Sequence, residues 1–105
     1  MKPPVSPSDL DRLLHEPARL SLSLLLDGQS ADFAYLKKSL GLTDGNLLFH
    51  LRALIEAGHV SENRARQLTK RLTFYELTPQ GQAALSRYRE CMIRILSGQG
   101  AKPEV

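Results

Sequence analysis

The chain has 105 residues, of which 42% are hydrophobic and 24% charged, and its formal net charge at pH 7 is +3. This length predicts one domain with a single core and leaves no room for an additional catalytic or regulatory domain. The longest apolar run, Leu24 to Leu26, is too short to span a bilayer, and the first residues lack a signal-peptide pattern, so we expect a cytoplasmic protein with no membrane partner.

Two short helices are expected in the N-terminal part of the chain. Ser8 followed by Asp11 is a capping signal, and the leucines behind it repeat at helical spacing, which predicts a first helix. Pro17 cannot continue that helix but suits the first turn of a second one, which would end near Leu26. The leucine–serine alternation from Leu20 to Leu24 also fits a strand, and the flanking proline and glycine favour the helix.

The middle of the chain predicts a helix-turn-helix. Residues 30–32 are expected to form a brief strand, after which Asp32 caps a helix over residues 33–40 that ends at Gly41. Thr43 then caps the next helix. Because the link between the two helices is so short, they are expected to meet in a tight turn.

The helix that begins at Thr43 has one apolar face and one free face. Leu47, Leu51 and Leu54 fall on the same side of a helical projection and are expected to face the core, and Gly58 is expected to end the helix in a left-handed conformation. The opposite face carries Gly45, Asn46, Phe49, Arg52, Ala53 and Glu56. We predict that this free face reads the major groove of DNA.

A basic hairpin is expected to follow. Residues 60–66 and 72–77 flank a polar connector over residues 67–71, and the second segment is rich in β-branched and aromatic residues, which predicts two strands joined by a long tip. Between residues 63 and 71 the charged side chains are all positive, namely Arg64, Arg66, Lys70 and Arg71. This run exceeds the net charge of the whole chain, so we expect it to contact phosphates or the minor groove.

The C-terminal part predicts one long helix. Thr78 and Pro79 are typical of a helix start, and the helix is expected to extend to about Ser97, with Gly98 as its cap. Its apolar stripe consists of Leu85, Tyr88, Met92 and Ile95. The predicted organisation is a flexible arm over residues 1–7, a single domain over residues 8–97 and a flexible tail over residues 98–105.

Two segments, LGLTDGNLLFHLRALIEAGHV and FYELTPQGQAAL, together resemble the small bacterial and archaeal winged-helix transcriptional regulators related to the MarR and ArsR groups. Residues 15–20, HEPARL, are similar to the segment that opens the first main helix of these proteins, and the resemblance covers residues 13–90. It implies a mainly α fold with a small β-hairpin (α+β), a winged helix-turn-helix, that binds double-stranded DNA as a homodimer. The recognition helix would be residues 43–57 and the wing residues 60–77.

The resemblance also implies that the terminal helices form the dimer interface. A chain this small has a limited core to receive both of them, which favours a homodimer with two recognition helices on successive major-groove faces. The interface residues would be Leu10, Leu13, Leu14, Leu85, Tyr88, Met92 and Ile95.

The candidate DNA-binding residues come from the recognition helix and the wing. Asn46 and Arg52 are the best candidates for base contacts, because each can form paired hydrogen bonds to a purine edge. Thr43 and the neighbouring amides can hold a phosphate at the helix N-terminus. The full set is Thr43, Asp44, Gly45, Asn46, Phe49, His50, Arg52, Arg64, Arg66, Lys70 and Arg71.

Leu48 and Phe49 depart from the pattern of the relatives, which commonly have a small polar residue followed by a basic or polar one. Phe49 can contact a thymine methyl group but cannot make the paired hydrogen bonds of Arg or Asn. An alternative interpretation is therefore a protein–protein interaction module that uses these two residues and binds DNA weakly or not at all. A third is a switch operated by an unknown small-molecule or protein effector in the dimer cleft, for which the sequence names no ligand.

Enzyme chemistry has no support in the sequence. His15, His50 and His59 form no ligand-like pair, and the single Cys91 offers neither a disulfide nor the paired thiolates of a metal site. Phosphate-binding glycine loops, nucleophile elbows and paired carboxylates do not stand out either. We therefore expect a protein that is not an enzyme and has no cofactor and no bound metal.

Overall fold

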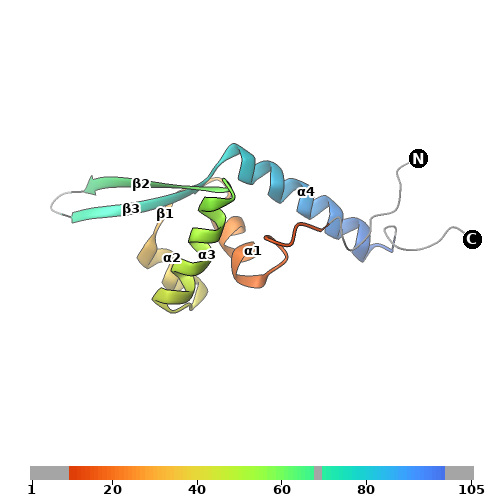
Figure 1. The fold of residues 1–105 in the computed structure, drawn as a ribbon, viewed down its shortest axis with the longest axis horizontal. Helices are drawn as coiled ribbons and strands as arrows, with labels where there is room; N and C mark the ends of the chain where they lie inside the picture. The colour runs from red at the N-terminus through yellow and green to blue at the C-terminus, as the bar shows by residue number, and fades with distance from the viewer. Residues whose placement is uncertain (1–9, 68–69, 99–105) are drawn as a thin grey trace, which may run out of the picture.

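The computed structural model describes residues 10–67 and 70–98, apart from the side chain of residue 67. In chain order its elements are α1 (Pro17–Leu25), β1 (Ala31–Asp32), α2 (Phe33–Leu40), α3 (Asp44–Glu56), β2 (Val60–Gln67), β3 (Lys70–Leu77) and α4 (Pro79–Leu96). Figure 1 shows α1, α2 and α3 gathered together, with the β2–β3 hairpin extending beyond them in one direction and α4 in the other. This is the predicted α+β fold with a helix-turn-helix followed by a hairpin.

The core is built mainly from leucines of the first three helices. Leu22 of α1, Leu36 of α2 and Leu47, Leu51 and Leu54 of α3 are all fully buried. Each such side chain contributes about 1.5–3 kcal/mol relative to an exposed one, so the three leucines of α3 anchor this helix firmly. The apolar face of α3 is therefore the predicted one. The sheet adds Ala31, Val60, Tyr75 and Leu77 to the same core, and α4 adds Ala84, Leu85 and Tyr88.

The helix ends follow the predicted local chemistry. Asp32 and Thr43 accept hydrogen bonds from the amides of Tyr35 and Asn46, at 2.8 and 3.2 Å, and so cap α2 and α3. Gly41 ends α2 in the left-handed region, with φ 64°. This residue lets the chain reverse directly into α3, which produces the tight turn of the helix-turn-helix.

The predicted first helix is wrong. Residues 12–14 form a single turn, in which the Asp11 carboxylate accepts hydrogen bonds from the amides of Leu13 (2.9 Å) and Leu14 (3.4 Å). The turn cannot grow into a helix because Glu16 precedes Pro17 and is held in an extended conformation, with φ −147° and ψ 128°. Ser8, the predicted cap, and the predicted arm over residues 1–7 lie outside the described residues, as does the tail after Gly98.

The sheet is antiparallel with strand order β1-β3-β2, and its hairpin is longer than predicted. Pairing of β2 with β3 runs from Val60 opposite Leu77 to Gln67 opposite Lys70, so most of the predicted polar connector belongs to the strands. The prediction failed because a two-stranded ribbon beyond the core needs no apolar face: its ladder hydrogen bonds form equally well between polar residues.

The end of α3 is tied to the start of α4. Thr78 caps α4 by accepting a hydrogen bond from the Gly81 amide (3.0 Å), and its hydroxyl donates to the carbonyl of Gly58 at 2.6 Å. The Thr78 amide also donates to the carbonyl of His59 at 2.9 Å. A Cβ atom on Gly81 would collide with that same His59 carbonyl, so only glycine permits this approach. The end of α3, the start of β2 and the start of α4 are therefore joined at one hydrogen-bonded junction.

Candidate nucleic-acid interface

The free face of α3 is exposed as predicted. Asn46, Phe49 and Arg52 are all exposed, and Phe49 retains 65% of its accessible surface. Leu48 is also exposed, at 44%. Because the buried leucines hold the opposite side of the helix, these side chains point away from the core and are available to a partner.

The N-terminus of α3 contains an ion pair that the sequence pattern did not reveal. Lys37 of α2 lies 2.8 Å from the carboxylate of Asp44, and both side chains are exposed. A surface pair of this kind contributes at most about 1 kcal/mol to stability. Its main effect is to balance the negative charge of Asp44, which would otherwise oppose a phosphate at the helix N-terminus. Lys37 therefore joins the predicted residues at this end of α3.

The register of the hairpin divides the four predicted basic residues between two faces. Arg64 lies opposite Thr73, and Arg66 lies opposite Arg71. Paired residues share a face and successive residues alternate, so these three arginines continue the face that carries the buried Val60, Tyr75 and Leu77. Lys70 lies on the other face. We call the side with the three arginines the helix-side face of the wing, because farther along the strands it packs on the helical core.

Tyr75 of β3 is buried between the hairpin and the helical core. Its hydroxyl donates a hydrogen bond to the carboxylate of Glu62, the residue directly opposite, at 3.1 Å. Burial, together with Glu62, raises the pKa of Tyr75 to about 12, while the charges of Arg52 and Arg64 oppose this rise. Arg52 comes from α3 and Arg64 from β2, and both act on one hydroxyl. Arg52 of α3 and Arg64 of β2 therefore both lie within electrostatic range of the Tyr75 hydroxyl.

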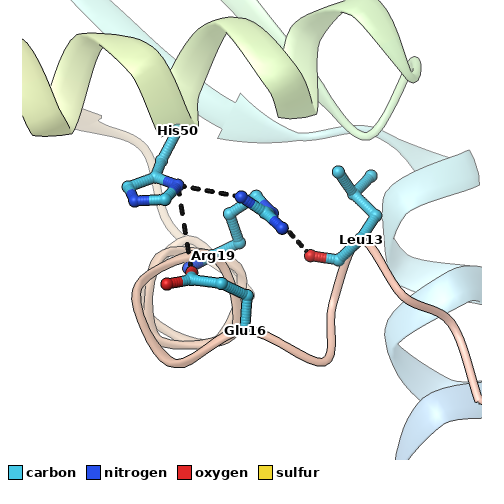
Figure 2. Close-up of polar contacts among 4 residues, drawn as sticks. All are labelled: Leu13, Glu16, Arg19 and His50. Atoms are coloured by element: carbon cyan, nitrogen blue, oxygen red, sulfur yellow. Dashed lines mark hydrogen bonds and ion pairs between the residues drawn. The ribbon is translucent and has the colours of Figure 1, made fainter.

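His50 is not on the free face. Its Nδ1 atom lies 3.1 Å from a terminal guanidinium nitrogen, Nη1, of Arg19 and 3.8 Å from a carboxylate oxygen of Glu16. Figure 2 shows both contacts as dashed lines. Only 14% of the histidine side chain is accessible. Arg19 was not among the predicted site residues, since a contact between positions 19 and 50 leaves no mark in local sequence spacing.

The predicted dimer residues fall into two groups. Leu14, Leu85 and Tyr88 are buried in the core of their own chain, where Tyr88 also shares a 2.8 Å hydrogen bond with Nδ1 of His15. Leu10, Leu13, Met92 and Ile95 are partly exposed. The most exposed apolar side chains of α4 are Ile93 and Leu96, at 59% and 78%. Leu85 and Tyr88 thus face their own domain, whereas Ile93 and Leu96, which lie outside the predicted stripe, face outward.

The remaining chemistry of the described residues is limited. Cys91 is a buried free thiol on α4. Within residues 10–67 and 70–98, histidine, cysteine, aspartate and glutamate side chains form no group of three that could hold a metal ion. In the same part of the chain, every helix is too short or too polar to cross a bilayer.

Comparison with known proteins gives consistent matches. A sequence family described as a winged helix DNA-binding domain matches residues 19–96. An uncharacterized protein of Methanocaldococcus jannaschii is 33% identical over 78 residues, which are 73% of this chain and 85% of that protein. The solved structure of a transcriptional regulator homologue from Pyrococcus horikoshii OT3 is 29% identical with a TM-score of 0.77, and the match covers 84% of this chain and 88% of the other. A protein from Enterococcus faecalis V583, described as a transcriptional regulator of the MarR family, is 25% identical with a TM-score of 0.71, over 83% and 80% of the two chains.

Proposed function

Because the chain belongs to the winged helix DNA-binding domain family, we propose that it is a homodimeric transcriptional regulator that binds a specific duplex site. One observation carries the proposal: Arg52 of the free face of α3 and Arg64 of the helix-side face of the wing both lie within electrostatic range of the Tyr75 hydroxyl. A helix that offers hydrogen-bonding side chains beside a strand pair that offers cations matches the two needs of DNA recognition, base readout and phosphate contact. The proposal implies a cytoplasmic protein, because it acts on promoter DNA.

The residues of the two elements would divide these tasks. Asn46 and Arg52 would contact base edges, each adding about 1–3 kcal/mol of discrimination where a paired hydrogen bond forms. The arginines of the helix-side face would contact phosphates or the minor groove, which adds affinity and register with little sequence preference. Thr43 accepts a hydrogen bond from the amide of Asn46, so the other first-turn amides of α3 would be the ones that bind a phosphate.

Self-association would use the outward side of α4. Ile93 and Leu96 are exposed apolar residues close together on this helix, and the partly exposed Met92 and Ile95 adjoin them along the sequence. Covering such a patch with a second copy removes apolar surface from water and places two recognition helices around a two-fold axis. An operator read in this way would be palindromic, with half-sites about one helical turn apart or a multiple of it.

Selection from a random duplex library at several salt concentrations tests the proposal. We expect enrichment of a palindromic sequence and affinity that falls steeply with salt. Asn46→Ala and Arg52→Ala should change the preferred bases, whereas Arg64→Ala should weaken binding to all sequences alike. A library without enrichment, bound without salt dependence, would refute the proposal.

The exposure of Phe49 and Leu48 favours a second candidate, a winged helix that binds a protein partner through α3. Phe49→Ser separates the two functions. In the DNA-binding protein this change removes an apolar base contact and alters preference at one A·T position. In the interaction module it leaves DNA binding unchanged and abolishes association with the protein partner.

A further inference from the structure

We propose that Arg19 is a positioning residue for DNA recognition, which locks the recognition helix to the turn before α1 through an unprotonated His50. Protonation of His50 would release this lock and weaken DNA binding. The inference rests on the proposed DNA-binding function. It concerns a contact cluster, defined here as Leu13, Glu16, Arg19 and His50 (Figure 2), in which the His50 side chain is largely buried.

Arg19 connects the turn before α1, the start of α1 and α3. Its Nε atom donates a 2.7 Å hydrogen bond to the carbonyl of Leu13, in the turn before α1. Its Nη1 atom lies 3.1 Å from His50 on α3. Its own backbone amide donates a 2.7 Å hydrogen bond to the carboxylate of Glu16, the cap of α1. One partly buried guanidinium thus joins the N-terminal turn to the helix that carries Asn46 and Arg52.

A hydrogen bond between Arg19 and His50 requires an unprotonated Nδ1. A guanidinium has only donors and keeps its proton in proteins, so Nδ1 of His50 must accept and the ring proton must sit on Nε2. In this state the 3.8 Å separation between Nδ1 and Glu16 is not an ion pair. A proton on Nδ1 reverses both relations: the ring repels Arg19 and attracts the Glu16 carboxylate. The cluster therefore has two alternative arrangements, selected by one proton.

Two charged groups, both from the start of α1, face His50 in the described part of the chain. Among the residues that the structure describes, Arg19 and Glu16 are the charged side chains that contact His50, both from the start of α1. On α3 itself the neighbouring contact is the ring of Phe49, whose centroid is 5.2 Å away in an edge-on arrangement. The Lys37–Asp44 pair that links α2 to α3 lies at the beginning of the helix, more than one turn before His50.

A displacement at His50 would reach the base-contact residues directly. Asn46 lies one helical turn before His50, and Phe49 is its neighbour, so a rotation of α3 that moves the histidine moves them as well. Packed helices change position in discrete steps and do not deform continuously. Loss of the Arg19 bond is therefore expected to lower the population of DNA-competent α3.

The test compares the DNA affinity of the wild type and His50→Gln from about pH 8 to about pH 5.5, the range over which histidine ordinarily gains its proton, at constant salt. Glutamine offers a carbonyl oxygen to Arg19 and does not titrate. We expect the wild type to lose about tenfold in affinity on acidification, a typical coupling between two linked events. His50→Gln should bind like the wild type at the upper pH and lose much less on acidification. His15→Gln, which changes the other hydrogen-bonded histidine, is the matched control and should keep the wild-type profile.

Two results would overturn the inference. A histidine that contacts a phosphate directly gains affinity when it becomes charged, so stronger wild-type binding in acid, absent from His50→Gln, contradicts the positioning role. Identical pH profiles of the wild type and His50→Gln contradict it as well. Arg19→Lys gives a second test: it keeps the charge but cannot hold both acceptors, and it should bind at the upper pH as the wild type does in acid. If Arg19→Lys does not fold, as circular dichroism would reveal, the His50→Gln profile still decides. Wild-type protein that binds no DNA at any pH refutes instead the proposed function.

Discussion

Arg71→Ala and Lys70→Ala form a matched pair that tests the face assignment of the wing. The two residues are neighbours on β3, both are exposed, and each substitution removes one positive charge. They differ in direction, because Arg71 lies on the helix-side face beside Arg66, whereas Lys70 lies on the opposite face. Net charge therefore cannot explain a difference between the two variants, and position can.

The expected effect follows from counterion release. Each phosphate that a protein neutralises adds about 0.9 to the slope of log affinity against log salt concentration. A dimer presents Arg71 twice, so Arg71→Ala should reduce the slope by about 1.8. Over a fourfold change in salt this corresponds to a difference of roughly 12-fold in affinity. Lys70→Ala should change the slope by less than half as much, since its charge acts only at longer range.

Fluorescence anisotropy with one selected duplex, measured between about 50 and 200 mM salt, gives both slopes. Thermal unfolding of the two free variants serves as the control, because a change in the hairpin itself would alter its stability. Equal slopes for the two variants would show that the faces of the wing do not contact DNA differently. A larger effect of Lys70→Ala would place DNA on the other face and reject the orientation argued above.

Three further predictions concern stability and assembly. Gly81→Ala should lower the free energy of unfolding by about 1–3 kcal/mol, because its methyl group overpacks the junction; urea denaturation would check this, with the exposed Gln82→Ala as the control. Tyr75 favours the folded state below its ordinary pKa of 10.0, and this contribution should be lost as pH rises toward about 12, since its pKa is higher in the folded protein. Denaturation at alkaline pH should therefore show a smaller loss of stability in Tyr75→Phe, and an equal loss would contradict the assignment. Leu96→Glu puts a charge in the exposed apolar patch of α4 and should dissociate the dimer in sedimentation experiments, whereas Ser86→Glu, at another exposed position of the helix, should not. A dimer that persists in Leu96→Glu would exclude the α4 patch from the interface.

Features set by neighbouring residues could be predicted from the sequence. The caps at Asp32, Thr43 and Thr78 depend on a side chain and an amide three residues later, so their spacing is visible in the chain. The leucine face of α3 depends only on helical periodicity. These signals were enough to predict the helix-turn-helix and the direction in which α3 presents Asn46 and Arg52.

Features set by distant partners could not be predicted. The hairpin extends to its Gln67–Lys70 pair because each strand supplies the hydrogen-bonding partner of the other, although neither has an apolar pattern there. The same register places Arg64, Arg66 and Arg71 on one face of the hairpin and Lys70 on the other. The Arg19–His50 contact joins positions 31 apart, and it holds His50, a predicted DNA-binding residue, away from the free face of α3. Ile93 and Leu96 fell outside the predicted apolar stripe of α4 because both sides of this helix carry apolar residues.

The Arg66–Arg71 pair has a consequence for the wing in the absence of DNA. Like charges directly opposite each other on a two-stranded ribbon destabilise it, and both of these arginines are exposed. Salt screens this repulsion, so the distal part of the free wing should become better ordered as salt rises, whereas DNA affinity falls. A phosphate between the two guanidinium groups would replace the screening ions. At low salt, the pairing of the strands at Arg66 and Arg71 and the binding of the DNA backbone would then occur together.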